Sequence, residues 1–233
     1  MKFLIIILLI TLITLAPSLY RWLAKKLLIL RIALSKDPYR LKENYITAHP
    51  DVSWWQKHPN YQAIIETRPL ISGYIADFGC NHGANTILMA REGNKAVGID
   101  INHKAIETAK KLSGREKQEI QQRLEFICAR FDSLPLADDL LDGGYMFDVF
   151  EHIYEKDRKG IFKEIKRVMK DGAKLLIITP FEKAYYDEIQ HVAFYNVSSL
   201  KAVLEENGLK IIEIKKIKDP NGDKISALVE IKP

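Results

Sequence analysis

Acidic and glycine residues stand around a predicted strand and turn in a pattern that can bind part of a nucleotide. The apolar run Tyr74–Phe78 contains Asp77, and Gly79 and Gly83 bracket the turn that follows. Asp100 ends the next apolar run, about twenty positions further along the chain. The backbone of such a turn and the N-terminus of the following helix can hold one end of a nucleotide, and a carboxylate can accept hydrogen bonds from ribose hydroxyls. This stretch therefore predicts a nucleotide-type binding site.

A second group of chemistry-bearing residues follows the predicted strand Leu141–Phe147. Asp148, Glu151 and His152 come directly after it, and His191 lies in a later polar and aromatic connection. Two carboxylates and an imidazole could hold a divalent ion that acidifies a substrate hydroxyl. Alternatively, His152 alone could act as a general base, because its unperturbed pKa lies near neutrality. In a third interpretation, Glu151 and His152 only cap and brace the next helix.

Strands and helices that alternate along the chain must position these residues. We expect helices at about 60–66, Ala84–Arg91, Lys104–Leu112 with Asn102 as N-cap, Lys156–Lys170 with Gly172 as C-cap, and Ser198–Glu206. We expect strands at Tyr74–Phe78, Ala96–Ile99, Leu124–Cys128, Leu141–Phe147, Lys174–Thr179, Lys210–Ile217 and Lys224–Ile231, the last two as a hairpin-like pair. Strands that alternate with helices indicate an α/β fold, in which ligands bind at the carboxyl ends of the parallel strands.

Several of these segments resemble one enzyme family. D-F-G-C-N-H-G at 77–83 resembles the D/E-x-G-C-G-x-G motif of class I S-adenosylmethionine-dependent methyltransferases, and Gly98–Asp100 resembles their second-strand ending. D-V-F-E-H-I at 148–153 is very like the V-L-E-H-I of type 11 methyltransferases, and also resembles the E-x-x-E-H metal-binding arrangement of ubiquinone-pathway O-methyltransferases. E-I-K-R-V-M-K-D-G-A at 164–173 resembles the R-x-L-K-P-G-G signature. The resemblance covers about Ala63–Ile217.

The resemblance implies a Rossmann-like, doubly wound, seven-stranded sheet, with S-adenosylmethionine as cofactor and methyl transfer as the reaction. The positions that match family cofactor contacts are Asp77, Gly79, Cys80, Gly83, Asp100, Ile101, Phe131 and Asp148. The candidate catalytic residues are His152, Glu151 and His191, and no metal ligand is assigned. His191-Val-Ala-Phe194 resembles the H-V-x-x-F of relatives that act on small or glycan-type substrates. O-methylation of a small, lipid-linked or glycan-type acceptor is therefore the expected reaction.

Two residues depart from the family pattern. Asn81 stands where a glycine is usual, although asparagine tolerates positive φ better than most residues. Arg130 stands where an acid commonly binds the adenine amino group, and a guanidinium cannot accept that hydrogen bond. These departures motivate an alternative, a membrane-anchored cofactor-binding module without methyl transfer activity. An NAD-dependent oxidoreductase would require a third glycine early in the helix after the turn. Ala84 stands there instead, which argues against that class of enzyme.

The N-terminal part of the chain has a different composition. Phe3–Tyr20 is a nearly continuous apolar run that would make a helix of about 27 Å, close to the thickness of a bilayer. Basic residues dominate Arg21–Lys42, and positive charge favours the cytoplasmic side of a membrane. We therefore expect a single-pass membrane protein with a transmembrane anchor at 1–20, a basic juxtamembrane segment at 21–60 and a methyltransferase domain at 61–233 that faces the cytoplasm. A cleaved signal peptide is the alternative for the apolar run.

Composition excludes some other classes of function. The net charge of +5 and the isoelectric point of about 9.0 are mild and partly local, so no nucleic-acid partner is expected. The two cysteines, Cys80 and Cys128, form no disulfide or zinc pattern. Cys80 could be a reactive thiol near the cofactor or a small packing residue. The partners expected are therefore an acceptor molecule and, through the N-terminal helix, a membrane.

Overall fold

The structure is a computed structural model, and it describes residues 52–182, 191–219 and 222–231. The chain divides into residues 1–42 and residues 43–233, and all described residues belong to the second part. The domain boundaries expected after residues 20 and 60 therefore stay predictions.

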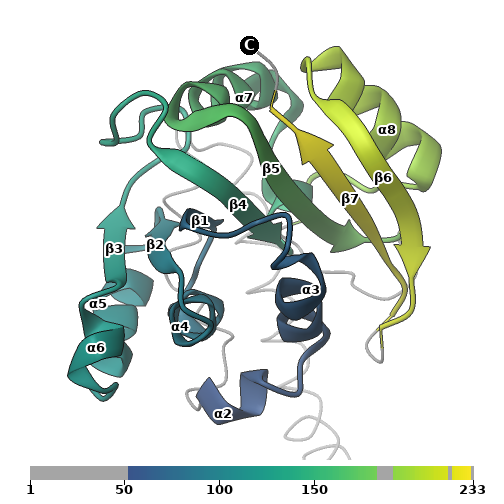
Figure 1. Cartoon of the computed structure of the whole chain (residues 1–233). Helices are drawn as coiled ribbons and strands as arrows, with labels where there is room; N and C mark the ends of the chain where they lie inside the picture. The colour runs from purple at the N-terminus through teal and green to yellow at the C-terminus, as the bar shows by residue number, and fades with distance from the viewer. Residues whose placement is uncertain (1–51, 183–190, 220–221, 232–233) are drawn as a thin grey trace, which may run out of the picture. The chain divides into compact units, whose positions relative to one another are not determined.

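Seven strands form one mixed sheet in the order β3-β2-β1-β4-β5-β7-β6 (Figure 1). Strands β1 to β5 are parallel to one another, whereas β7 is antiparallel to both β5 and β6. The strands are β1 Tyr74–Phe78, β2 Lys95–Asp100, β3 Leu124–Cys128, β4 Leu141–Phe147, β5 Met169–Pro180, β6 Lys210–Ile217 and β7 Lys224–Glu230. The expected seven-stranded sheet is confirmed, and its last two strands pair as predicted.

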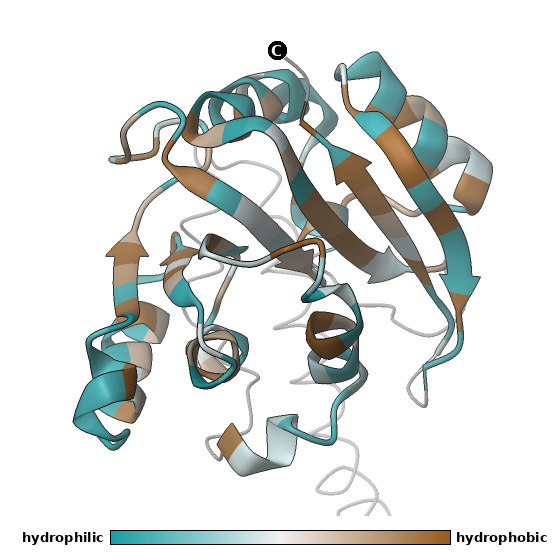
Figure 2. Cartoon of the chain, in the orientation of Figure 1, coloured by the Kyte–Doolittle hydropathy of each residue, from teal (hydrophilic) through white to brown (hydrophobic). Residues whose placement is uncertain are grey.

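The sheet is buried on both faces because apolar side chains alternate along its central strands. In β5, Leu175 and Ile177 join the hydrophobic cluster that contains Phe162 of α7 (Glu155–Val168) and Leu200 of α8 (Val197–Glu206). Leu176 and Ile178 join the cluster on the other face, which contains residues of α3 (Pro59–Thr67) and α4 (Ala84–Arg91). Figure 2 shows β7 hydrophobic along most of its length, whereas the edge strand β6 alternates with hydrophilic residues. Helices therefore cover both faces, as the doubly wound prediction requires.

Local hydrogen bonds set the ends of several helices. Asn102 caps α5 (His103–Ser113) by accepting a hydrogen bond from the backbone N–H of Ala105 at 3.2 Å. Asn196 and Ser199 form a reciprocal capping box at the start of α8. Three short elements were not predicted: α2 Val52–Trp55, α6 Gln118–Gln121 and the 3₁₀ helix η2 Phe150–His152. The last of these matters for function, because it carries Glu151 and His152.

The predicted boundary between α7 and β5 is wrong. Helix α7 ends at Val168, and Met169 already pairs with Leu141 at the start of β4. Gly172 is therefore not a helix C-cap, although its φ of +76° is the left-handed conformation that glycine adopts easily. The apolar residues Val168 and Met169 continue the helical spacing in sequence, so tertiary pairing rather than local pattern ends this helix.

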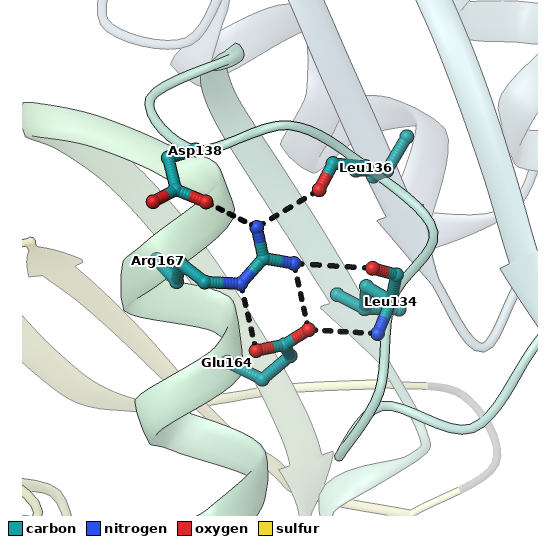
Figure 3. A network of polar contacts seen from close by, with 5 residues as sticks. All are labelled: Leu134, Leu136, Asp138, Glu164 and Arg167. Carbon is teal, nitrogen blue, oxygen red and sulfur yellow. Dashed lines mark hydrogen bonds and ion pairs between the residues drawn. The ribbon is translucent and has the colours of Figure 1, made fainter.

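Arg167 near the end of α7 fixes the connection between β3 and β4. Figure 3 shows its guanidinium between the carboxylates of Glu164 and Asp138 and the carbonyl oxygens of Leu134 and Leu136. Glu164 also accepts a hydrogen bond from the backbone N–H of Leu134 at 2.8 Å. These contacts hold the connection that follows the predicted adenine-side segment around Phe131 against the body of the domain.

The expected localisation needs correction. Within residues 52–182, 191–219 and 222–231, no helix combines the length and the apolar content that crossing a bilayer requires. This finding contradicts the expectation of a single-pass membrane protein whose catalytic domain faces the cytoplasm, and with it the expected membrane partner. The apolar run Phe3–Tyr20 and the basic segment Arg21–Lys42 themselves lie outside the described residues.

Candidate active site

The turn after β1 packs so closely that two of its residues must be glycine. Gly79 has φ +83° and Gly83 has φ +79°. A Cβ atom added to Gly79 would lie 2.2 Å from Cγ2 of Val149, and one added to Gly83 would lie 2.5 Å from the ring of Phe126. The backbone N–H groups of Gly79 and Cys80 both donate to the carbonyl of Ile99, at 2.8 and 3.1 Å. The turn is thus tied to β2 and approaches the segment that follows β4.

Asp100 at the end of β2 is held by the two turns beside it. Its Oδ2 accepts from the backbone N–H of Asn81 at 2.9 Å, and its Oδ1 accepts from the backbone N–H of Asn102 at 2.8 Å. Burial raises the pKa of this carboxyl, whereas the backbone hydrogen bonds lower it. Each carboxylate oxygen has lone pairs left for a further donor. Asp100 is therefore oriented in advance, as a carboxylate that accepts from two ribose hydroxyls must be.

Asn81 keeps the turn conformation that a glycine would give. Its φ is +50°, in the left-handed region, so the substitution does not change the path of the backbone. The side-chain oxygens of Asn81 and of Asn85, the second residue of α4, are buried and have no hydrogen-bond partner. Buried acceptors of this kind require a donor. The ammonium of the expected cofactor, S-adenosylmethionine, would supply such donors, so the residues present fit that group.

Asp77 is buried beneath the turn rather than exposed to a ligand. Its carboxylate is only 2% exposed and accepts a hydrogen bond from the hydroxyl of Thr86 at 2.6 Å. Burial, more than the nearby charge of Asp100, raises the pKa of Asp77 to about 7. Asp77 therefore joins β1 to α4 from inside the fold, and any effect on a cofactor would pass through the turn.

Replacing Asp77 by asparagine tests this burial. The native state holds the Asp77 proton up to about pH 7, while the unfolded chain loses it near its ordinary value of 3.8. Because the native state binds more protons in that window, the stability of the protein falls as pH rises through it, by up to about 4 kcal/mol. We expect Asp77→Asn to unfold at a higher temperature than the parent chain at about pH 8, and at a similar temperature at about pH 4.

Thermal unfolding followed across this pH range measures the effect, with Glu119→Gln on the exposed side of α6 as the matched control. Asparagine keeps an oxygen that accepts from Thr86. Parallel curves for Asp77→Asn and the parent chain at every pH would contradict a buried, protonated Asp77.

The remaining predicted cofactor residues lie around the same turn. Cys80 is 6% exposed and burial raises the pKa of its thiol well above the usual value, so it is a packing residue rather than a reactive thiol. The carbonyl of Ile101 accepts from the thiol of Cys128 at 3.5 Å. The ring of Phe131 packs edge-on against Phe78, with centroids 5.8 Å apart, which places it beside the end of β1.

Arg130 does not point an unpaired charge at the adenine position. Its Nε and Nη2 donate to the two carboxylate oxygens of Asp132 at 3.1 and 2.9 Å. This fork-on-fork pair satisfies the guanidinium locally and lowers the pKa of Asp132. The departure from the family pattern at position 130 is therefore accompanied by an acid two residues later.

The second group of predicted residues comes together in space. Ligand-type atoms of Glu151, His152 and His191 all lie within 4.8 Å of one another, and the rings of the two histidines are 4.9 Å apart at their centroids. The backbone N–H groups of Val192 and Ala193 donate to the carbonyl of Glu151, which fixes the later segment against η2. Residues 40 positions apart in sequence thus share one site.

Glu151 is buried within this group. It is 2% exposed and accepts a hydrogen bond from the hydroxyl of Thr179 at the end of β5, at 2.9 Å. Burial, and next the charge of Asp148, raise the pKa of Glu151, while Lys224 opposes the shift. Oε1 of Glu151 lies 3.9 Å from Nε2 of His152, whose side chain is 26% exposed. The partly exposed imidazole of His152 therefore lies next to the buried carboxyl of Glu151.

Lys224 is a site residue that sequence reasoning missed. Its ammonium is buried and pairs with Asp148 at 2.8 Å and with Asp219 at 3.6 Å. Asp148 has φ +54°, an uncommon conformation for a residue other than glycine, and its carboxylate turns to this lysine. A lysine in a sequence usually indicates the surface. The pairing of β7 with β5 brings Lys224 opposite Pro180, and the predicted hairpin of β6 and β7 alone does not indicate this.

Asp148 therefore does not join Glu151 and His152, with which the sequence grouped it. The structure joins Glu151 and His152 with His191, whereas Asp148 is engaged by Lys224. Val149, between these residues, is the side chain that a Cβ at Gly79 would strike. The two groups of candidate residues consequently lie against each other at the carboxyl ends of β1, β2 and β4, where ligands bind in such sheets.

Comparison with known proteins finds methyltransferases. Residues 76–177 match the family described as Methyltransferase domain. An O-methyltransferase of Aspergillus nomiae is 28% identical over 159 residues, which are 64% of this chain and 69% of that protein. A 24-methylenesterol C-methyltransferase of Oryza sativa is 29% identical over 99 residues, but the chain spans only 26% of its length.

Solved structures share the fold. A methyltransferase from Aquifex aeolicus superposes with a TM-score of 0.63 at 20% identity, covering 84% of this chain and 100% of that one. The 1,6-didemethyltoxoflavin N1-methyltransferase of Burkholderia thailandensis, solved with bound 1,6-didemethyltoxoflavin and S-adenosylhomocysteine, superposes with a TM-score of 0.63 at 13% identity over 77% of this chain and 81% of that one. At these identities the similarity shows the architecture, which is the one that the sequence predicted.

Proposed function

Because residues 76–177 form a class I S-adenosylmethionine-dependent methyltransferase domain, we propose that this chain methylates a hydroxyl group of a small or glycan-type acceptor. The observation that carries this proposal is the convergence of Glu151, His152 and His191 within 4.8 Å, next to the glycine turn. The name of the Aspergillus nomiae relative, an O-methyltransferase, supports oxygen as the acceptor atom. The lipid-linked acceptor rested on the expected membrane helix and is not carried forward.

The cofactor supplies a sulfonium-bound methyl group that is already activated, so the protein contributes mainly orientation and proton removal. Asp100 would accept hydrogen bonds from the ribose hydroxyls, and the amide oxygens of Asn81 and Asn85 would accept from the ammonium. The glycine turn leaves room for the backbone to approach, because no side chain projects from Gly79. These contacts fix one reactant before the acceptor enters.

His152 would remove the proton of the acceptor hydroxyl. Its imidazole is partly exposed, so a substrate can reach it, and the buried carboxyl of Glu151 lies 3.9 Å behind it. When His152 takes up the substrate proton, the positive imidazolium favours the ionised form of Glu151, and the resulting carboxylate stabilises the imidazolium. The ring of His191 packs edge-on against His152 and would restrict the orientations open to it. Glu151 and His191 thus position the base, and His152 touches the substrate.

Product analysis tests the proposal directly. The full chain is incubated with methyl-labelled S-adenosylmethionine and a panel of phenols, catechols and sugars, beside matched amines and activated carbon acids. Mass spectrometry then locates the label in each product. We expect label on oxygen alone. Label on nitrogen or carbon would overturn the acceptor atom, and cofactor binding without transfer to any member of the panel would favour the binding module over the enzyme.

A further inference from the structure

Arg158 and Tyr195 form a pair of polar side chains beside the candidate active site. The guanidinium carbon of Arg158, on the first turn of α7, lies 5.9 Å from the ring centroid of Phe150 and 5.7 Å from that of Tyr195. The two rings stack on each other with centroids 5.0 Å apart. Phe150 is fully buried and Tyr195 is 3% exposed. The aromatic pair therefore gives the guanidinium a rigid apolar support.

The inner donors of this pair lack an acceptor in the described part of the chain. Nε of Arg158 is buried without a hydrogen-bond partner, and no ion pair joins Arg158 to a described carboxylate. The hydroxyl of Tyr195 is also buried, and the guanidinium of Arg158 beside it opposes the burial that raises its pKa, but no described acceptor takes the hydroxyl proton. The contrast with other cations is clear, because Arg167 contacts Glu164 and Lys224 contacts Asp148. A guanidinium is always charged, and leaving its inner donor dehydrated and unpaired is unfavourable.

The position of the pair relates it to the acceptor. Arg158 lies six positions after His152, and Tyr195 lies four positions after His191. The chain between the last two is held by hydrogen bonds from Val192 and Ala193 to the carbonyl of Glu151. Helix α7 begins directly after η2, so its first turn lies at the same end of the sheet as the candidate base. The charge of Glu151, the carboxyl behind His152, acts on the hydroxyl of Tyr195, which places the pair near the candidate base.

We propose that Arg158 and Tyr195 bind an anionic group, a carboxylate or a phosphate, on the acceptor of the methyl group. The identification of the ligand as the acceptor rests on the proposed function. Arg158 is partly exposed, so an anion can reach its outer donors from solvent, and the dehydrated surroundings strengthen the attraction. Burial raises the pKa of Tyr195 to about 12, so its hydroxyl stays protonated and able to donate. The substrate class becomes hydroxy acids and hydroxylated phosphate esters, rather than neutral glycans.

Calorimetric titration of the full chain with three aromatic probes tests the anion site. Benzoate represents the carboxylate, phenyl phosphate the phosphate, and benzyl alcohol a neutral ligand of similar shape. Each is titrated with and without saturating S-adenosylhomocysteine. We expect one or both anions to bind at least about tenfold more tightly than benzyl alcohol, as charge-assisted hydrogen bonds would produce. The stronger of the two anions identifies the group that the acceptor carries.

Variants assign the site to this pair. Arg158→Met keeps the length of the side chain and removes the charge, and Tyr195→Phe removes only the hydroxyl. Lys159→Met is the matched control, because it removes a neighbouring exposed cation of the same helix. We expect Arg158→Met to lower the affinity for the anion at least about tenfold, Tyr195→Phe to lower it less, and Lys159→Met to leave it unchanged.

Equal affinities for anions and benzyl alcohol in the parent chain would overturn the proposal, and so would equal losses in Arg158→Met and Lys159→Met. If Arg158→Met does not fold, Tyr195→Phe provides the test, and an unchanged anion affinity in that variant would then overturn the proposal. Failure of the proposed function is a separate result. If S-adenosylhomocysteine does not bind but an anion does, and Arg158→Met removes that binding, the anion site stands and the methyl transfer proposal falls.

Discussion

Replacing Asp100 by alanine is expected to weaken S-adenosylmethionine binding by at least about a hundredfold. Its carboxylate would accept two hydrogen bonds from the ribose, and bonds to a charged acceptor contribute about 1.5–3 kcal/mol each. It also holds the backbone N–H groups of Asn81 and Asn102, so its loss loosens the turn that surrounds the cofactor. Calorimetric titration with S-adenosylmethionine measures the loss.

Two further variants separate the effect of the Asp100 charge from that of its shape, and from the loss of any acidic side chain nearby. Asp100→Asn keeps the shape and one oxygen, and we expect a smaller loss than in Asp100→Ala. Glu107→Ala removes an exposed acid from the next helix, and we expect no loss. Thermal unfolding of each variant shows whether the fold is retained. An affinity of folded Asp100→Ala within about threefold of the parent chain would place the cofactor elsewhere.

Replacing His152 by glutamine is expected to lower kcat for the acceptor found in the labelling panel by about 10²–10⁴-fold, the usual contribution of a general base. Glutamine has a similar size and can still donate a hydrogen bond, but it cannot take up the substrate proton. The affinity for S-adenosylmethionine should not change, because the cofactor contacts lie around Asp100 and the glycine turn. Steady-state kinetics and a cofactor titration on the same preparation measure the two quantities.

His103→Gln is the matched control. It removes a histidine of α5 whose side chain is 71% exposed. If His152 only braced the fold, His152→Gln would lower the unfolding temperature and leave kcat of the folded protein nearly unchanged. That combination would transfer the role of base to another group.

The bounds of three parallel strands could be predicted to the residue. β1, β3 and β4 agree with the expected ranges because each appears in the sequence as a short, largely apolar run next to turn residues. The conformation of Asn81 also follows from its residue type, since asparagine enters the left-handed region at modest cost. Residue type and local sequence pattern were sufficient to predict these strand bounds and this backbone conformation.

Contacts between distant segments could not be predicted. Nothing in the neighbourhood of Asp77 shows that Thr86 will bind its carboxylate, and nothing near Asp148 shows that Lys224 will. The end of α7 was predicted wrongly for the same reason. Met169 fits the helical pattern in the sequence, but in the structure it pairs with Leu141 of β4. A motif in the sequence names candidate site residues, but it does not name their electrostatic partners, because those partners come from other elements.

The place of β7 in the sheet has a consequence for how the protein is made. It lies between β5 and β6, which do not pair with each other, so β6 has no partner until residues 224–230 have been synthesised. A nascent chain that has reached Ile217 exposes one whole edge of β5, a strand of apolar residues open to pairing with other chains. Pairing of Lys224–Glu230 with β5 is therefore the step that closes this edge against other chains.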